Sequence, residues 1–282
     1  MKKLTLAYTI LALFINASFL FAQVKLIYNV KYLPDTLSTQ YQEELMALVI
    51  KEKETLFYNE TKFRLDSLYD AATQQYLHTG IAPNINIKND FNIGNIHDRM
   101  KGKMYLLKNL NSKTYRFEDE KFNRWTINKK EKKTILGYDC YKAVGVFGGR
   151  KWIAWYTPDI PIPEGPYRFM GLDGLILEVA DTENHYTFTA VSIEKIKSNT
   201  KIRQVNFINT SKKEYEKFLA KHIEDPAMEI RAASIQSVGT TMRGTDGKTI
   251  TYNDLIDAVT REFREFQKTH NNPIEKGSIW IR

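Results

Sequence analysis

Residues 103–157 constrain the fold of this chain more than any other part of the sequence. They form short segments rich in β-branched and aromatic side chains, separated by Asn-Ser, Lys-Lys or Gly-Gly pairs. Such segments are typical of antiparallel strands joined by tight turns. The Gly148-Gly149 pair suits a two-residue hairpin turn, because that turn favours positive φ. Residues 174–196 predict another hairpin, with Asp-Thr-Glu-Asn at its tip.

Elements flank this region on both sides. Residues 24–32 alternate between apolar and polar, which predicts a half-buried strand, and residues 45–59 predict a second strand with its turn. Residues 60–77 repeat apolar side chains every three or four positions, which predicts a helix ended by Gly80 and Pro83. The Asn- and Gly-rich residues 79–95 predict a surface loop.

The C-terminal part of the chain changes to helical patterns. Ser211 is the expected N-cap of a short helix, and residues 253–269 predict an amphipathic one. The four prolines of residues 157–166 predict an extended crossing loop. We therefore expect a β-rich α+β fold: a large, curved, mostly antiparallel sheet with a few packed helices. Residues 23–282 are expected to form a single domain, with a helical portion at about 211–270.

The first 22 residues indicate export. Lys2 and Lys3 precede an apolar run over residues 4–21, and Ala22-Gln23 offers a cleavage point, as in a signal peptide. An uncleaved membrane anchor is the alternative. Cys140 is the only cysteine, so no lipid-bearing cysteine lies at the junction. We expect a mature protein without a transmembrane domain, in the periplasm or on the surface of a Gram-negative-type envelope.

The net charge and the cysteine content limit which partners and which crosslinks this chain can have. The formal net charge is +8, and the lysines are scattered, as in a surface that favours solubility. Contact with anionic envelope surfaces is the alternative. Without a focused basic stripe, no nucleic-acid partner is predicted. A single cysteine also excludes an internal disulfide.

Metal and thiol chemistry find little support in the sequence. Asp181, Glu183 and His185 fall at two-residue steps, so one face of an extended strand could present all three to a metal. They lie on a polar hairpin tip, however, and a solvated tip is the favoured interpretation. Cys140 lies in mid-strand, where a core residue is favoured and a functional thiol or metal ligand is the alternative. No metal or other cofactor is predicted.

Carboxylate pairs are the remaining route to catalysis. Glu164, Asp173 and Glu178 are close in sequence, and glycoside hydrolysis needs two carboxylates across a cleft. Pairing with Arg168 or a lysine is the favoured explanation for Glu178. Because no Gly-x-Ser-x-Gly elbow occurs, an α/β-hydrolase is excluded. No catalytic residue is assigned.

Aromatic side chains gather around the proline-rich loop. Concave β-surfaces lined by such side chains form either ligand pockets or ordinary cores, and both interpretations stay open here. The candidate ligand-binding residues are Trp152, Trp155, Tyr156, Tyr167 and Arg168.

The stretch after this loop carries a family resemblance. Residues 165–179 read GPYRFMGLDGLILEV, in which a turn leads into an apolar strand and no phosphate-loop Lys-Ser/Thr follows. Together with the upstream GYDCYKA, the stretch resembles the GLPGLI family of exported bacterial proteins, with Asp173 in place of the family's proline. The resemblance implies an envelope protein without established catalytic residues. The motif residues are Gly171, Leu172, Asp173, Gly174, Leu175 and Ile176.

These observations together favour a non-enzymatic exported protein. We expect it to bind an apolar small molecule, lipid, peptide or envelope partner in the concavity of the sheet. One alternative is a structural accessory that docks onto an outer-membrane receptor or transport complex. The other is a hydrolase that uses Glu178 or Asp173.

Overall fold

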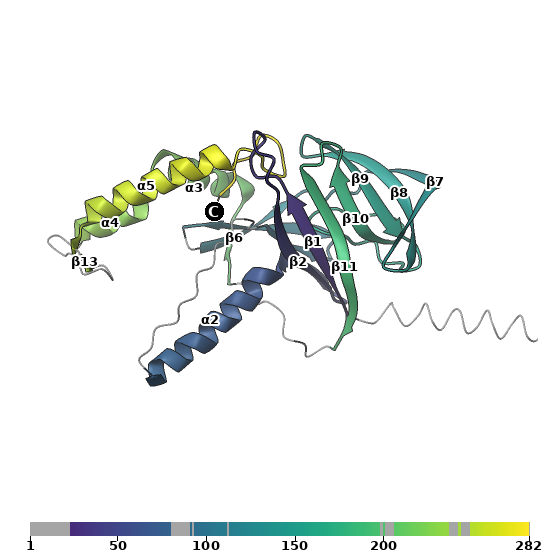
Figure 1. The fold of residues 1–282 in the computed structure, drawn as a ribbon, viewed down its shortest axis with the longest axis horizontal. Helices are drawn as coiled ribbons and strands as arrows, with labels where there is room; N and C mark the ends of the chain where they lie inside the picture. The colour runs from purple at the N-terminus through teal and green to yellow at the C-terminus, as the bar shows by residue number, and fades with distance from the viewer. Residues whose placement is uncertain are drawn as a thin grey trace, which may run out of the picture.

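A single large sheet dominates the protein (Figure 1). The computed structural model describes residues 23–79, 91, 93–111, 113–197, 200, 206–236, 242–243 and 249–281. Twelve strands follow the order β12-β6-β5-β4-β3-β2-β1-β11-β10-β9-β8-β7. All neighbours are antiparallel except β12 and β6, so the predicted β-rich α+β class is confirmed. The strands are β1 (Gln23–Tyr32), β2 (Gln42–Ile50), β3 (Glu54–Asn59), β4 (Gly94–Asp98), β5 (Lys103–Leu110), β6 (Lys113–Asp119), β7 (Thr126–Ile135), β8 (Tyr138–Phe147), β9 (Arg150–Thr157), β10 (Leu175–Asp181), β11 (Tyr186–Ile196) and β12 (Ile208–Asn209).

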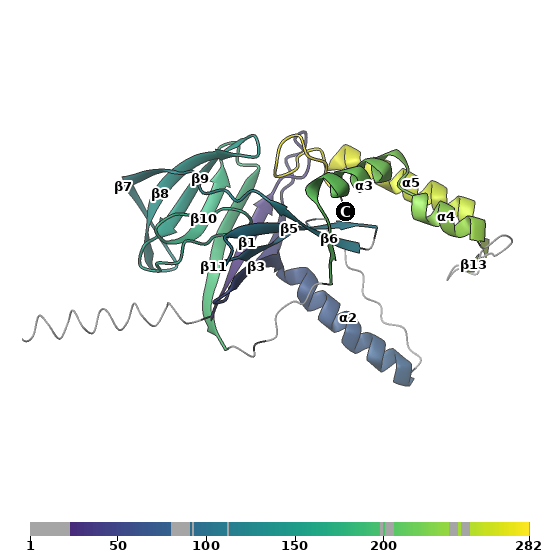
Figure 2. The same ribbon diagram turned by 180° about the vertical axis from the view of Figure 1, so that it is seen from behind.

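The connection between β6 and β7 requires the sheet to be rolled. These strands are consecutive in the chain but lie ten positions apart in the sheet order, which is about 48 Å in a flat sheet. Residues 120–125 join them and can span at most about 25 Å. The sheet therefore curls into a trough, with β7–β10 and β5–β6 as its two sides (Figures 1 and 2).

Residues 120–125 are fixed to the proline-rich crossing that follows β9. The backbone N–H of Phe122 donates to Arg168 O at 2.9 Å, and that of Met170 donates to Phe122 O at 2.9 Å. Phe122 and Phe169 are buried in the main core. The two crossing segments thus fill part of the concave side of the sheet.

The core lies on the concave face, and one helix covers part of the convex face. Along β1 the even-numbered side chains are buried in the main core, as the alternation predicts. A smaller cluster on the other face includes Ile27, Val49 and Tyr58. Phe63 of helix α2 (Glu60–Thr79) packs on Tyr58 with ring centroids 5.7 Å apart. Amphipathic patterning therefore decides which face each element buries.

The remaining helices lie together beyond the β5–β6 side of the sheet (Figure 2). Tyr215 of α3 stacks on Phe117 of β6 at 4.9 Å. Ser211 caps α3 as predicted, and Thr251 and Asp254 form a capping box at the start of α5.

Within the described ranges, no helix has the length and apolarity needed to cross a bilayer. The helices are α2 (Glu60–Thr79), α3 (Lys212–Glu224), α4 (Met228–Gln236) and α5 (Tyr252–Thr269), and β13 (Met242–Arg243) and β14 (Thr249–Ile250) form a second, two-stranded sheet.

Two local predictions were wrong. The expected Lys-Lys turn is absent, since β7 continues through it with a register shift between Asn128 and Lys132. The turn lies instead at Leu136-Gly137, with φ values of 52° and 82°. Part of the expected loop at 79–95 is strand β4, because pairing with β3 and β5 outweighs its Asn- and Gly-rich composition. The predicted leader 1–22, Gly80 and Pro83 lie outside the described residues.

Candidate functional site

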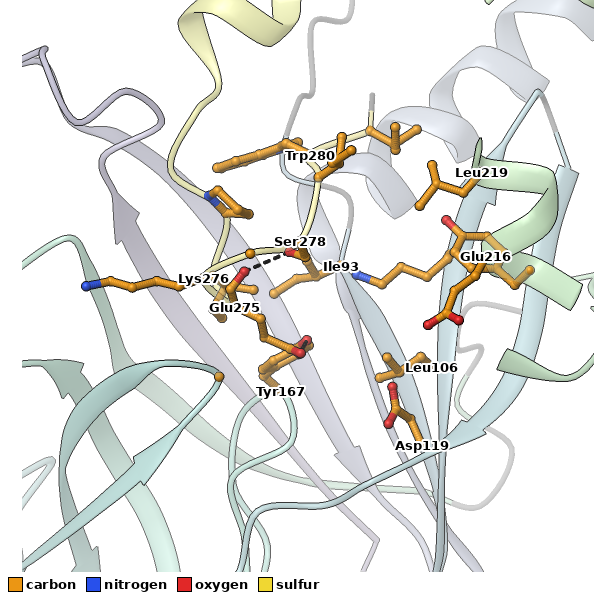
Figure 3. A pocket seen from close by; sticks show the side chains of 18 of the residues that line it. Ile93, Leu106, Asp119, Tyr167, Glu216, Leu219, Glu275, Lys276, Ser278 and Trp280 are labelled. Atoms are coloured by element: carbon orange, nitrogen blue, oxygen red, sulfur yellow. Dashed lines mark hydrogen bonds between the residues drawn. The ribbon is translucent and has the colours of Figure 1, made fainter. Parts of the chain in front are cut away.

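A cavity of about 560 Å³ opens between the sheet, helix α3 and the C-terminal segment 273–281 (Figure 3). Strands β5 and β6 provide one wall, and Trp280 lies across the cavity from Asp119 and Leu106. Its volume falls within the range of about 300–1,000 Å³ that is usual for ligand sites. We consider this cavity the candidate functional site.

Aromatic and aliphatic side chains form most of its surface. Phe91, Trp280 and Tyr186 meet where the C-terminal segment crosses the sheet. The rings of Phe91 and Trp280 lie 6.0 Å apart, and those of Phe91 and Tyr186 lie 6.4 Å apart. Tyr215 and Leu219 add the wall from α3. This lining suits the apolar part of a ligand.

Two carboxylates in the lining are held by one buried arginine. Arg168 Nη2 lies 3.3 Å from Asp119, and Nη1 donates to Glu275 at 2.7 Å. Lys212 adds a second cation 3.1 Å from Asp119. The Tyr167 hydroxyl also donates to Glu275, and burial raises its pKa well above the usual range, which keeps it a neutral donor. Both carboxylates are therefore engaged in charge-assisted contacts.

Lys108 is a charged group of the cavity without such partners. It lies on β5 between the buried residues Leu106 and Leu110, two positions from each, and thus on the concave side. Among the residues that the structure describes, its ammonium group has no hydrogen-bond or ion-pair partner. Burial lowers the pKa of Lys108, and the charge of Glu275 offsets part of that effect.

Arg150 fixes the C-terminal segment that covers the cavity. It lies on β9 with an exposed fraction of 2%. Its guanidinium donates to Ile274 O at 3.0 Å, to Asp181 at 2.8 Å and to the side chain of Asn272 at 2.5 Å. A further bond runs to Pro273 O at 2.9 Å. Residues 272–274 are thereby bound to the sheet through one side chain.

Arg150 also contacts the cluster that the sequence offers as a possible metal site. Ligand atoms of Asp181, Glu183 and His185 do lie within 4.8 Å of one another. Arg150 Nη1 lies 2.8 Å from Asp181, 3.2 Å from His185 Nδ1 and 3.7 Å from Glu183. Lys276 pairs with Glu183 at 2.6 Å. The positive charge at this cluster thus comes from Arg150 and Lys276.

The five aromatic and basic candidates occupy different environments. Trp152 and Tyr156 are 0% exposed and belong to the core. Trp155 points to the opposite side of β9 and is half-buried, with Lys133 Nζ 5.7 Å from its ring. Tyr167 lines the cavity, and Arg168 contacts two of its lining carboxylates. The ligand-binding role of these residues remains a prediction.

The GLDGLI stretch forms a tight passage from the crossing loop into β10. Gly171 has φ +84°, and a Cβ atom on Gly174 would lie 2.0 Å from Thr157 O. Asp173 is exposed and lies 3.5 Å from Lys129. Both glycines are therefore explained by backbone geometry. Leu172, Leu175 and Ile176 are buried in the main core.

The remaining candidates are also engaged in local contacts. Cys140 is fully buried, and desolvation raises its pKa to about 11. Glu178 accepts from Lys133 at 2.7 Å, and Glu164 lies 2.9 Å from His97 Nδ1. Neither Glu164 nor Glu178 lines the cavity.

Sequence reasoning missed several side chains of the cavity, namely Lys108, Asp119, Glu275 and Trp280. One signal for Lys108 was available, because a lysine interrupts the apolar face formed by Leu106 and Leu110. Asp119, Glu275 and Trp280 carry no comparable signal. Their proximity depends on the way the C-terminal segment folds back over the sheet.

Comparison with known proteins corrects the family assignment. Residues 87–218 match the family model described as "N-glycanase peptide, N-terminal domain". This range contains both motifs on which the resemblance to the GLPGLI family rests, so that assignment was wrong. The motif encodes a glycine turn before a core strand, a local geometry that does not define a family by itself. No curated protein matches the chain.

Two solved structures of PNGF-II, in space groups P21 and C2, are similar to this chain. They are 19% and 18% identical to it, with TM-scores of 0.49 and 0.50. Each alignment covers 71% of this chain and 33% of the PNGF-II chain. The chain therefore spans about a third of the length of these structures, and the C2 structure indicates a shared fold.

Proposed function

We propose that this chain is an exported, non-enzymatic binding protein whose cavity accepts an amphipathic ligand. The observation that carries the proposal is the 560 Å³ cavity itself, in which an aromatic wall faces a set of charged side chains. Pockets that bind small molecules typically combine a mostly apolar lining with a few converging polar groups. The apolar leader at residues 1–22 supports export.

The state of the cavity carboxylates favours binding over catalysis. A general acid or base must exchange a proton with the substrate. Asp119 and Glu275 are instead fixed by Arg168, which contacts both. Such charge-assisted contacts hold the carboxylates in place and orient them. We therefore assign these residues a structural and recognition role.

A neutral fluorescent dye tests whether the cavity binds apolar molecules. We expect Nile red to bind the full chain saturably with one site. Leu219→Trp places a larger ring in the cavity from α3 and should reduce dye affinity at least tenfold. Ile223→Trp introduces the same ring at an exposed position of the same helix and should leave affinity unchanged.

Two results would refute this proposal. One is the absence of saturable dye binding to folded wild-type protein. The other is undiminished binding by Leu219→Trp when circular dichroism shows that the variant is folded.

A glycan-bearing peptide is a second candidate for the ligand. The match of residues 87–218 to an N-glycanase N-terminal domain favours it. These residues include Lys108, Asp119, Tyr167 and Tyr215 of the cavity. Titration with an N-glycopeptide should then quench tryptophan fluorescence saturably, and the same peptide without its glycan should not. Equal responses to both peptides would exclude glycan recognition.

A further inference from the structure

We infer that the ligand of this cavity is an amphiphilic carboxylate whose charged group pairs with Lys108 while its apolar body lies against the aromatic wall. The inference rests on the proposed binding function and specifies the chemical class of the ligand. It depends on the position of Lys108, on the partners of the other charges and on the apolar lining.

The position of Lys108 is unusual for a lysine. Successive inward side chains of β5 are Met104, Leu106, Lys108 and Leu110, of which the three apolar ones are at most 3% exposed. An ammonium group in such a row loses part of its hydration, which is unfavourable unless a counter-ion replaces the water. Lysines are accordingly rare at buried positions without a partner.

The acidic groups nearby have other partners. Asp119 lies between Arg168 at 3.3 Å and Lys212 at 3.1 Å. Glu275 accepts from Arg168 at 2.7 Å and from the Tyr167 hydroxyl. Asp119 and Glu275 thus already contact Arg168, Lys212 or the Tyr167 hydroxyl, and neither forms an ion pair with Lys108.

The other charged lining residues are Glu216 and Lys276. Glu216 lines the cavity from α3 (Figure 3), and because this residue is exposed, water can solvate its carboxylate. Lys276 is paired with Glu183 at 2.6 Å. A ligand carboxylate would therefore meet a half-buried ammonium group in the cavity that has no hydrogen-bond or ion-pair partner among the described residues.

The apolar part of the lining indicates the chemistry of the rest of the ligand. Phe91, Trp280, Tyr215 and Leu219 offer only carbon surface or ring faces over most of their area. A hydrocarbon or aromatic body gains from contact with this wall because its surface is removed from water. An inorganic anion would lack that gain, and a neutral hydrocarbon would leave Lys108 unpaired.

Displacement of Nile red by three ten-carbon amphiphiles tests the inference. Decanoate, decan-1-ol and decyltrimethylammonium share an apolar chain and differ in head-group charge. They are used below their critical micelle concentrations at pH 7.5. We expect wild-type protein to bind decanoate roughly 10- to 100-fold more tightly than decan-1-ol, as is usual for a hydrogen-bonded charge pair. Decyltrimethylammonium should bind most weakly.

Two substitutions on β5 locate the charge effect. Lys108→Met should abolish the preference for decanoate while leaving decan-1-ol binding unchanged or tighter. Lys103→Met removes an exposed lysine of the same strand, outside the cavity and paired with Glu118 at 2.7 Å, and should keep the preference. Circular dichroism and unchanged Nile red affinity serve as folding controls for both variants.

The outcomes separate this inference from the proposed function. Failure of Nile red to bind would refute the binding function itself. Normal dye binding with equal affinities for decanoate and decan-1-ol would overturn only the carboxylate inference. Retention of the decanoate preference by folded Lys108→Met would overturn it as well.

Discussion

Arg150 donates to Asp181 at 2.8 Å, and both side chains are only 1% exposed. The same guanidinium bonds to Asn272 and to the carbonyl groups of Pro273 and Ile274. The ion pair thus connects the start of β9 and the end of β10 with the segment that covers the cavity. Removal of one partner of a buried pair leaves an uncompensated charge, which is strongly destabilising.

Arg150→Met should therefore lower the free energy of unfolding by about 3–5 kcal/mol. Urea denaturation measures the change, and limited proteolysis should show earlier cleavage near the C-terminus. Lys151→Met at the exposed neighbouring position should stay within about 0.5 kcal/mol of wild type. Equal stability of Arg150→Met and wild type would show that the pair contributes nothing.

Gly174→Ala should be much more destabilising than Gly137→Ala. A Cβ atom at Gly174 meets Thr157 O at 2.0 Å, and a clash with backbone cannot be relieved by a rotamer change. Gly137 has φ +82° with open space around it, so alanine there costs only about 1–2 kcal/mol of conformational strain. Denaturation midpoints of both variants give the comparison. Similar losses of stability in the two variants would mean that the backbone around Gly174 shifts easily to accommodate the Cβ atom.

Much of the fold follows from local sequence patterns. The alternation of β1, the Gly148-Gly149 turn and the Ser211 cap each depend on a few adjacent residues, and the structure confirms them. β4 escaped prediction because its strand character comes from its neighbours β3 and β5. The rolling of the sheet could not be predicted either, because it depends on pairing between residues far apart in the chain.

The same distinction applies to the candidate site. Tyr167 and Arg168 lie beside the proline-rich loop, where the density of aromatic residues drew attention to them. Glu275, which Arg168 contacts, is 107 positions further along the chain. No local pattern can indicate a contact at that separation. The sequence therefore indicates Tyr167 and Arg168 as site residues but not Glu275.

The Cys140 thiol should be almost inert in the folded protein. Desolvation raises its pKa to about 11, so only about 0.1% is thiolate at pH 8, and the thiolate is the reactive form. Reaction with 5,5′-dithiobis(2-nitrobenzoic acid) should proceed over hours and become rapid in urea. Rapid reaction of native protein would instead support a functional thiol at this position.

Alkaline pH should unfold the protein together with ionisation of its buried tyrosines. Burial raises the pKa values of Tyr28, Tyr167 and Tyr186 well above the usual range in the folded state. In the unfolded chain these phenols ionise near pH 10. Their contribution to stability is therefore complete below pH 10 and is lost as the pH rises further.

Absorbance at 295 nm and far-ultraviolet circular dichroism, recorded in parallel, test this prediction. The buried groups should ionise in one step that coincides with unfolding. Complete ionisation near pH 10 with an intact dichroism spectrum would contradict the burial of these side chains.

The order of strands also determines when the sheet can be completed. β1 is the first described strand, yet it lies in the interior of the sheet, between β2 and β11. Gln23 is opposite Ile196 in that pairing, so the two halves of the sheet cannot join until the chain up to Ile196 is available. Pairings of such separation slow folding, because loop closure precedes the contacts that stabilise it. During synthesis the N-terminal strand must therefore remain without its second neighbour until most of the protein exists.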